Sequence, residues 1–407
     1  MFENLFYQEA GKLLAADFER KILPGAILLC GSEYSGKLTA ALELARVLLC
    51  RANPAGKSDC DCPSCVRSRQ MLNPNLLLLG PKSSRLEISA LKNTFLQAVA
   101  DNTSYCAESH RFFVVAVRKL LARFSEILWQ KDTNATKIGV LVSEIADLLD
   151  EIDVARPLPE SKKLEKIVSE IEKSCEKLEN SYLYDSIPIA QIRNVEEWSS
   201  MMSDSCRVVI LENAEKMQDS VRNALLKTLE EPPSNTFFIL TTSNRGAILP
   251  TILSRVRLYS FSKRSADEEK EIIRRIFHTE SESISLYFQR FLGVPEETLR
   301  DSAVRFLTAA VSGNFAESNA IVKNCASFEP RVLLKLFFSE AENLLRPLMK
   351  TAEGVSALKD INAEMREAWQ NVTVFNQNPE AALDILLRRI FSVNRSHGGA
   401  VASTIRT

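Results

Sequence analysis

Four cysteines lie close together in the sequence, at Cys50, Cys60, Cys62 and Cys65. Thiolates are preferred ligands of Zn²⁺, and structural zinc sites hold the ion with four ligands in tetrahedral geometry. The loop between these cysteines is rich in Pro, Gly and charged residues, so a bound metal would supply much of its folding energy. We therefore expect a closed, structural zinc site here. Free thiols or adventitious disulfides are the alternative.

A glycine-flanked loop offers a second kind of chemistry. It follows a predicted buried strand, Ala26–Cys30, and reads Gly31-Ser32-Glu33-Tyr34-Ser35-Gly36-Lys37. Between a strand and a helix, such a P-loop directs backbone N–H groups and a helix N-terminus toward an anion, and its lysine reaches the β- and γ-phosphates of a nucleotide. If ATP or ADP binds here, the expected binding residues are Gly31, Ser35, Gly36, Lys37, Leu38 and Thr39.

The P-loop departs from the usual pattern directly after its lysine. A Ser or Thr normally follows as a magnesium ligand, whereas this chain has Leu38. Thr39 comes one residue late and would point about 100° around the helix. We therefore expect no efficient hydrolysis by this chain alone. Nucleotide binding and retention of the loop only as a scaffold both stay open.

Residues 223–255 supply further polar groups at the end of a strand. Their pattern predicts a helix, a turn at Pro232-Pro233, a buried strand at Phe237–Leu240, a loop and a second helix. A hydroxyl and amide cluster, Thr241 to Asn244, follows the strand, and ligands of open α/β sheets bind at the carboxyl ends of strands. Arg255 comes one helical stretch later.

This stretch resembles the nucleotide-site core of bacterial DNA polymerase III clamp-loader subunits, which are AAA+ proteins, and is most similar to their delta-prime type. Ser254-Arg255-Val256 matches the Ser-Arg-Cys motif of that family apart from its last residue. The resemblance implies an α/β AAA+ fold, with a P-loop NTPase-like parallel sheet and flanking helices. It also implies a four-cysteine zinc module, an α-helical lid and an α-helical C-terminal collar.

The resemblance assigns roles to several residues. Hydrolysing relatives end a strand in Asp-Glu where this chain has Glu212-Asn213, and Ala316 stands where a sensor-2 arginine is expected. Thr242 takes the sensor-1 position. Arg255 is retained, and it could act in trans as an arginine finger on a neighbouring subunit's γ-phosphate. A local salt bridge that holds its helix is the alternative role.

The elements that position these residues suggest three domains. We expect an AAA+ nucleotide-site domain at 1–263, a helical lid at 264–325 and a helical collar at 326–407. The first contains the zinc module, 50–65, and a helical insert at about 84–186 with little counterpart in the family pattern. The insert should hold a helix at 112–129 and an antiparallel hairpin of two helices over 138–152 and 164–178. The tail from Ser396 is expected to be disordered.

Composition restricts the function classes. At 407 residues the chain can form several cores, and its net charge of -1 gives no overall attraction to nucleic acid. We expect no membrane association, because no apolar run approaches the roughly 18 residues of a membrane span, and a cytoplasmic location, because the N-terminus does not resemble a signal. Nine cysteines, an odd number, argue against a disulfide framework.

The expected function is therefore that of a delta-prime-type subunit that does not hydrolyse ATP itself. Its implied partners are the gamma/tau- and delta-type subunits of a hetero-pentamer, which loads the sliding clamp onto primer-template DNA. One alternative is an active gamma/tau-type ATPase. Another is a non-catalytic scaffold whose helical insert binds a partner, although the insert could also be a decoration without a partner.

Overall fold

The computed structural model describes residues 1–202, 205–292, 296–313, 331–373 and 377–405. They form two compact units, Met1–Phe291 and Leu292–Thr407. This division falls within the expected lid, 264–325, so the three-domain assignment stays a prediction. None of the helices in the described ranges is long and apolar enough to cross a membrane.

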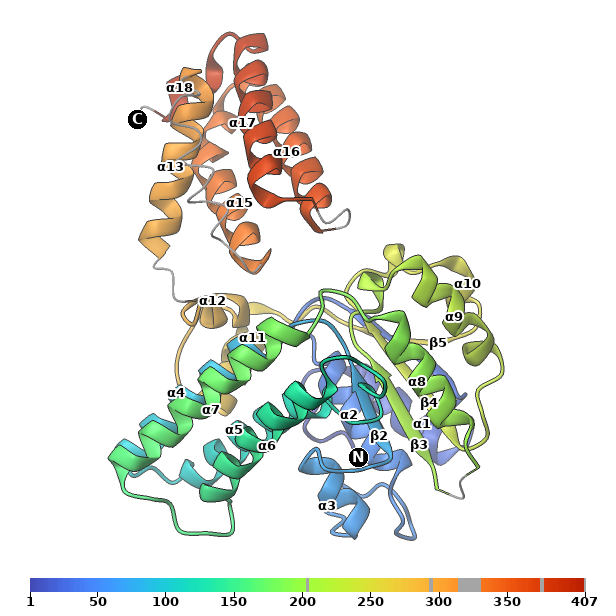
Figure 1. Ribbon diagram of the computed structural model, residues 1–407. Coiled ribbons are helices and arrows are strands. Elements are labelled where there is room, and N and C mark those ends of the chain that lie inside the picture. Colours follow the sequence, from blue (N-terminus) through green and yellow to red (C-terminus); the bar gives the residue numbers. More distant parts are fainter. Residues whose placement is uncertain (203–204, 293–295, 314–330, 374–376, 406–407) are drawn as a thin grey trace. The chain divides into compact units, whose positions relative to one another are not determined.

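A parallel five-stranded sheet forms the centre of the first unit (Figure 1). Its strands are β1 (Ala26–Gly31), β2 (Leu76–Leu79), β3 (Arg207–Leu211), β4 (Thr236–Thr242) and β5 (Arg257–Phe261), in the order β2-β3-β4-β1-β5. All four pairings are parallel, so the carboxyl ends of the strands meet at one edge. The P-loop leaves β1 at that edge, and the register pairs Cys30 with Thr242 of β4.

Both faces of the sheet are buried under helices. Successive residues of a strand point to opposite faces, so each strand contributes to both cores. Ile27 and Leu29 of β1 belong to a core shared with α1 (Glu9–Glu19) and α2 (Lys37–Leu48). Leu28 belongs to the core on the other face, to which α8 (Ile189–Ser200) and α9 (Asp219–Glu230) contribute. This double burial explains why the strands read as continuous apolar runs.

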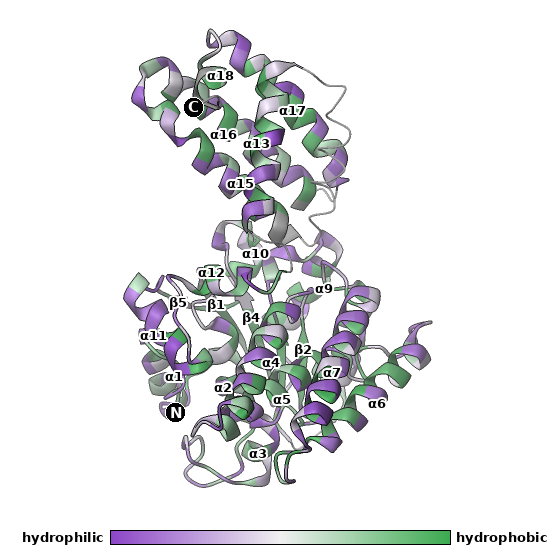
Figure 2. Ribbon diagram, turned by 90° about the vertical axis from the view of Figure 1, so that its left-hand side faces the viewer, coloured by the Kyte–Doolittle hydropathy of each residue, from purple (hydrophilic) through white to green (hydrophobic). Residues whose placement is uncertain are grey.

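Segment 84–186 forms four helices and is part of the core of this unit. They are α4 (Arg85–Ala100), α5 (Cys106–Ala122), α6 (Ala135–Glu151) and α7 (Ser161–Tyr182). Their buried residues join the same core as Leu77 and Leu79 of the sheet. The predicted hairpin is confirmed, since α6 and α7 lie side by side (Figure 1). Figure 2 shows both hydrophobic and hydrophilic colours along them, as expected for helices with one buried face.

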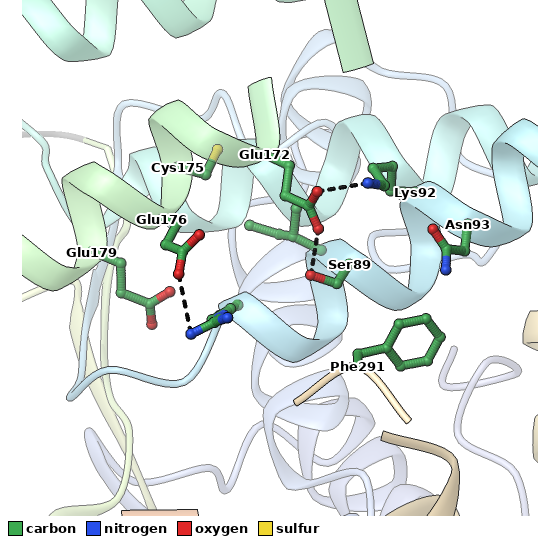
Figure 3. A pocket seen from close by; sticks show the side chains of 10 residues that line it. Ser89, Lys92, Asn93, Glu172, Cys175, Glu176, Glu179 and Phe291 are labelled. Atoms are coloured by element: carbon green, nitrogen blue, oxygen red, sulfur yellow. Dashed lines mark hydrogen bonds and ion pairs between the residues drawn. The ribbon is translucent and has the colours of Figure 1, made fainter. Parts of the chain in front are cut away.

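Charged residues join α4 to α7 around a pocket of about 230 Å³ (Figure 3). Glu172 accepts hydrogen bonds from Ser89 at 2.5 Å and from Lys92 at 2.6 Å. Arg85 and Glu176 form an ion pair at 3.1 Å. Because these charged groups pair with one another across the pocket, they connect the two helices rather than offering an open binding site.

The remaining helices of the first unit are short or peripheral. α3 (Pro63–Arg69) follows the cysteine loop, and α10 (Pro250–Leu253) precedes Arg255. After β5 come α11 (Ala266–Phe277) and α12 (Ile284–Gln289). Ser265 caps α11 in a capping box with Glu268.

The described part of the second unit is helical. It contains α13 (Glu296–Ser312), α15 (Arg331–Leu345), α16 (Ala352–Thr373), α17 (Pro379–Ser396) and α18 (Ala400–Ile405). The Asn378 side chain caps α17, and Pro379 is the first residue of the helix. The disorder expected from Ser396 onward is wrong for α18. Val401 is buried, and the Asn394 side chain accepts hydrogen bonds from the N–H groups of Val401 and Ala402.

Candidate nucleotide site and metal centre

The side chain of Lys37 forms hydrogen bonds within the P-loop. Lys37 Nζ donates hydrogen bonds to the carbonyl oxygens of Gly31, at 2.8 Å, and Ser32, at 2.5 Å. Only 9% of the lysine is exposed, and burial lowers its pKa. Gly36 adopts a left-handed φ of 91°, which starts α2. Arg264 donates to the Tyr34 carbonyl on the other side of the loop.

The two residues after Lys37 lie in different environments. Leu38 is partly buried and packs against the core that α1 and α2 share. Thr39 is exposed on α2. The hydroxyl group expected of a P-loop is therefore replaced by an apolar contact, as the sequence indicates.

The carboxyl end of β3 places Glu212 beside an arginine from segment 84–186. Glu212 Oε2 lies 2.5 Å from Arg123 NH2, and the Arg123 side chain is only 1% exposed. Asn213 adopts a left-handed φ of 54°, and its N–H donates to Thr241 Oγ1 at 3.2 Å. The end of β3 thus carries a carboxylate in an ion pair followed by an amide, where hydrolysing relatives carry Asp-Glu.

Thr242 is fully buried and serves the loop that follows β4. Its hydroxyl donates to the Asn244 carbonyl at 3.2 Å and accepts from the Asn244 N–H at 3.1 Å. Its neighbour Ser243 bonds Glu215 through both its N–H and its hydroxyl. These bonds fix the loop, and the sensor-1 role of Thr242 stays a prediction.

Arg255 forms hydrogen bonds to Glu230 and Thr251, neither of which belongs to the P-loop. Its Nε and NH2 atoms donate to Glu230 Oε2 at 3.0 and 2.9 Å, and its NH1 atom donates to the Thr251 carbonyl at 2.9 Å. The arginine side chain is 28% exposed and that of Glu230 is 58% exposed. An ion pair this open to solvent is weak, so the guanidinium can be drawn to another anion.

The predicted cysteine cluster is brought together. The four sulfur atoms of Cys50, Cys60, Cys62 and Cys65 all lie within 4.8 Å of one another, so they could hold a metal ion. The Cys65 N–H points at Cys62 Sγ, and such backbone hydrogen bonds lower the pKa of Cys62 to about 6. The donor set fits a structural zinc ion.

Arg46 supports this cluster from α2. Its NH1 atom lies 3.2 Å from Cys65 Sγ, and its guanidinium also bonds Glu43 and the carbonyls of Gly56 and Lys57. The arginine is 2% exposed. It therefore ties the cysteine loop to the sheet domain and places a positive charge beside the thiols.

Several site residues were missed at the level of sequence. Arg123, Arg264 and Glu230 all contact a predicted site residue or its loop, but each is distant in the sequence from its partner. No local pattern indicates such pairs. The expected sensor-2 position, Ala316, lies outside the described residues.

A parallel sheet with a strand–P-loop–helix unit at its carboxyl edge defines the class of the first unit as an AAA+-type, P-loop NTPase-like α/β domain. The family model described as "DNA polymerase III, delta subunit" matches residues 7–123 and 140–265, more than half of the chain. The chain belongs to this family. The matched ranges include most of segment 84–186, for which the motifs indicated little counterpart.

Individual relatives agree with this assignment over shorter stretches. A DNA polymerase III subunit delta' from Haemophilus influenzae is 30% identical over 123 residues, which are 29% of this chain and 38% of that protein. The delta' subunit of Escherichia coli is 47% identical over 53 residues, 13% of this chain and 16% of its own length. The match thus spans well under two thirds of these relatives.

A solved structure of a DNA polymerase III gamma subunit-related protein from Thermotoga maritima is 16% identical, with a TM-score of 0.27. The match covers 55% of this chain and 90% of that one. A TM-score this low is no evidence for a shared fold, which rests instead on the sheet and the family match.

Proposed function

We propose that this chain is a delta-prime-type clamp-loader subunit that completes a neighbouring subunit's ATP site through Arg255 and does not hydrolyse ATP itself. The complex would load a sliding clamp onto primer-template DNA, with gamma/tau- and delta-type subunits as the other members of a hetero-pentamer. The four cysteines would hold a structural zinc ion. A cytoplasmic location follows from this role.

One contrast carries the proposal. The P-loop lysine is buried and bonds its own loop, whereas Arg255 is partly exposed and its ion-pair partner is a solvent-exposed carboxylate. A guanidinium inserted beside a γ-phosphate stabilises transition-state charge and contributes roughly 10³–10⁵ in rate in other NTPases. The chain is therefore equipped to donate a catalytic group and poorly equipped to use one.

The test is the DNA- and clamp-stimulated ATPase rate of the reconstituted complex with Arg255→Ala. We expect normal assembly and a rate lower by an order of magnitude or more. Arg274→Ala is a matched control, because Arg274 also forms a surface pair with a glutamate, Glu271, but lies on α11. An unchanged rate in an intact Arg255→Ala complex would show that Arg255 is only structural.

The alternative of an active gamma/tau-type ATPase is disfavoured by Leu38 and by the Glu212–Arg123 pair. The alternative of a scaffold that binds through segment 84–186 needs a different test from deletion of the segment. Since its helices share the core of the sheet, deletion would unfold the first unit. Substitutions on exposed positions such as Val140 would test that alternative without disturbing the core.

A further inference from the structure

Arg123 is placed at the carboxyl edge of the sheet by segment 84–186. It is the C-cap residue that follows α5, and its side chain is 1% exposed. One NH2 atom contacts Glu212 Oε2 at 2.5 Å and Ser83 Oγ at 3.3 Å, while NH1 donates to the Pro81 carbonyl at 3.2 Å. The guanidinium thus bridges the loop after β2 and the end of β3.

The surroundings hold Arg123 in this position. A Cβ atom at Gly80 would lie 2.4 Å from Arg123 NH1 and 2.9 Å from Glu212 Cβ, so only glycine allows this approach. Trp129 Nε1 donates to the Arg123 carbonyl at 2.9 Å. Glu179 of α7 accepts hydrogen bonds from the N–H groups of Ser83 and Ser84, which fixes the loop that receives the guanidinium.

Arg123 neutralises the charge of Glu212, which leaves no need for a metal ion there. The Glu212 side chain is 13% exposed, and a carboxylate so little hydrated requires a counter-charge. Arg123 already supplies it. A divalent cation at Glu212 would have to displace the guanidinium or share the carboxylate with it, and either change leaves a buried positive charge uncompensated.

We propose that Arg123 is a positioning residue that acts as a built-in counter-cation of Glu212 and excludes divalent metal ions from the carboxyl end of β3. This inference rests on the proposed non-hydrolysing role and deepens it. Segment 84–186 would then block metal binding through Arg123. This effect would add to the loss of the hydroxyl ligand at Leu38.

The test is thermal unfolding of the full chain with and without Mn²⁺, after the cysteine cluster has been loaded with zinc. Wild type should show no Mn²⁺-dependent shift. Arg123→Ala should unfold at a lower temperature, and millimolar Mn²⁺ should raise its midpoint by about 2–5 °C, because the ion replaces the missing charge. Arg123→Ala/Glu212→Gln should show no such shift, because it lacks both charges.

Two results would overturn the proposal. The first is a folded Arg123→Ala variant whose unfolding midpoint Mn²⁺ does not raise, or raises equally when Glu212 is also replaced by Gln. The second result does not depend on the folding of an Arg123 variant. We expect Mn²⁺ to leave the unfolding midpoints of wild type and Glu212→Gln equally unchanged. A shift in wild type that Glu212→Gln abolishes would show that the carboxylate binds metal. Either failure would leave the Arg255→Ala result unaffected, because that experiment measures turnover at a neighbour's site.

Discussion

Arg123 and Arg255 both pair with a glutamate, but burial separates their roles. Arg123 is 1% exposed and its partner Glu212 is 13% exposed, so separating them would leave uncompensated charge in the interior. Arg255 is 28% exposed and Glu230 is 58% exposed, so water can replace either partner. At the scale of residues, one arginine is a fixed structural charge and the other is available for exchange.

This difference predicts the effect of Glu230→Gln. The free energy of unfolding should change by less than about 1 kcal/mol, because solvent screens the pair. The ATPase rate of the reconstituted complex should stay the same or rise, since Arg255 loses a competing anion. Urea denaturation and ATPase assays measure the two effects, with Glu271→Gln on α11 as the control. A large loss of rate in an intact complex would mean that Glu230 aims the arginine.

The cysteine cluster predicts a metal dependence that belongs to its four residues. Cys62→Ala should abolish stoichiometric zinc binding and make residues 50–65 sensitive to protease, because the loop loses its metal cross-link. Cys106→Ala, at the start of α5, should retain the metal. Elemental analysis and limited proteolysis test this. Full zinc occupancy in Cys62→Ala would contradict the four-thiolate site.

At the scale of elements, segment 84–186 is a supporting layer of the sheet. Phe113 of α5 is fully buried and stacks on Phe95 of α4 with ring centroids 6.0 Å apart. The same core includes Leu77 and Leu79 of β2. The helices therefore contribute to the stability of the sheet and position Arg123 at its carboxyl edge.

Phe113→Ala should accordingly destabilise the whole first unit. We expect a loss of about 3–5 kcal/mol in the free energy of unfolding, as for other large-to-small core substitutions. Urea denaturation followed by the fluorescence of the chain's tryptophans would measure it. Val140→Ala, on the exposed side of α6, should change stability by no more than about 0.5 kcal/mol. Equal effects of the two variants would mean that the segment folds apart from the sheet.

Local patterns predicted much of the fold. The buried strands β1 to β4 read as apolar runs, and the spacing of apolar residues predicts the hairpin of α6 and α7. β5 is not predicted, because Arg257 and Ser260 interrupt its apolar residues and the strand directly follows a predicted helix. The helix expected at 112–129 ends at Ala122, where the chain turns to present Arg123.

The contiguous motifs of the candidate site could be predicted from the sequence, whereas the pairs of distant residues could not. The P-loop and the four cysteines are each contiguous, so their spacing indicated them directly. The Arg123–Glu212 pair joins residues 89 positions apart, and the Arg255–Glu230 pair joins residues 25 apart. Only the tertiary fold, including the packing of α9 against α10, brings these side chains together, and no local pattern encodes that.

At the scale of the whole molecule, the chain is expected to contribute an arginine to a neighbour while its own P-loop stays inactive. The most direct test compares Lys37→Met and Arg255→Ala in the same reconstituted complex, after both are shown to assemble. Lys37→Met should leave the DNA- and clamp-stimulated ATPase rate essentially unchanged, whereas Arg255→Ala should lower it by an order of magnitude or more. The opposite pattern, with turnover lost in Lys37→Met and retained in Arg255→Ala, would contradict the proposed role.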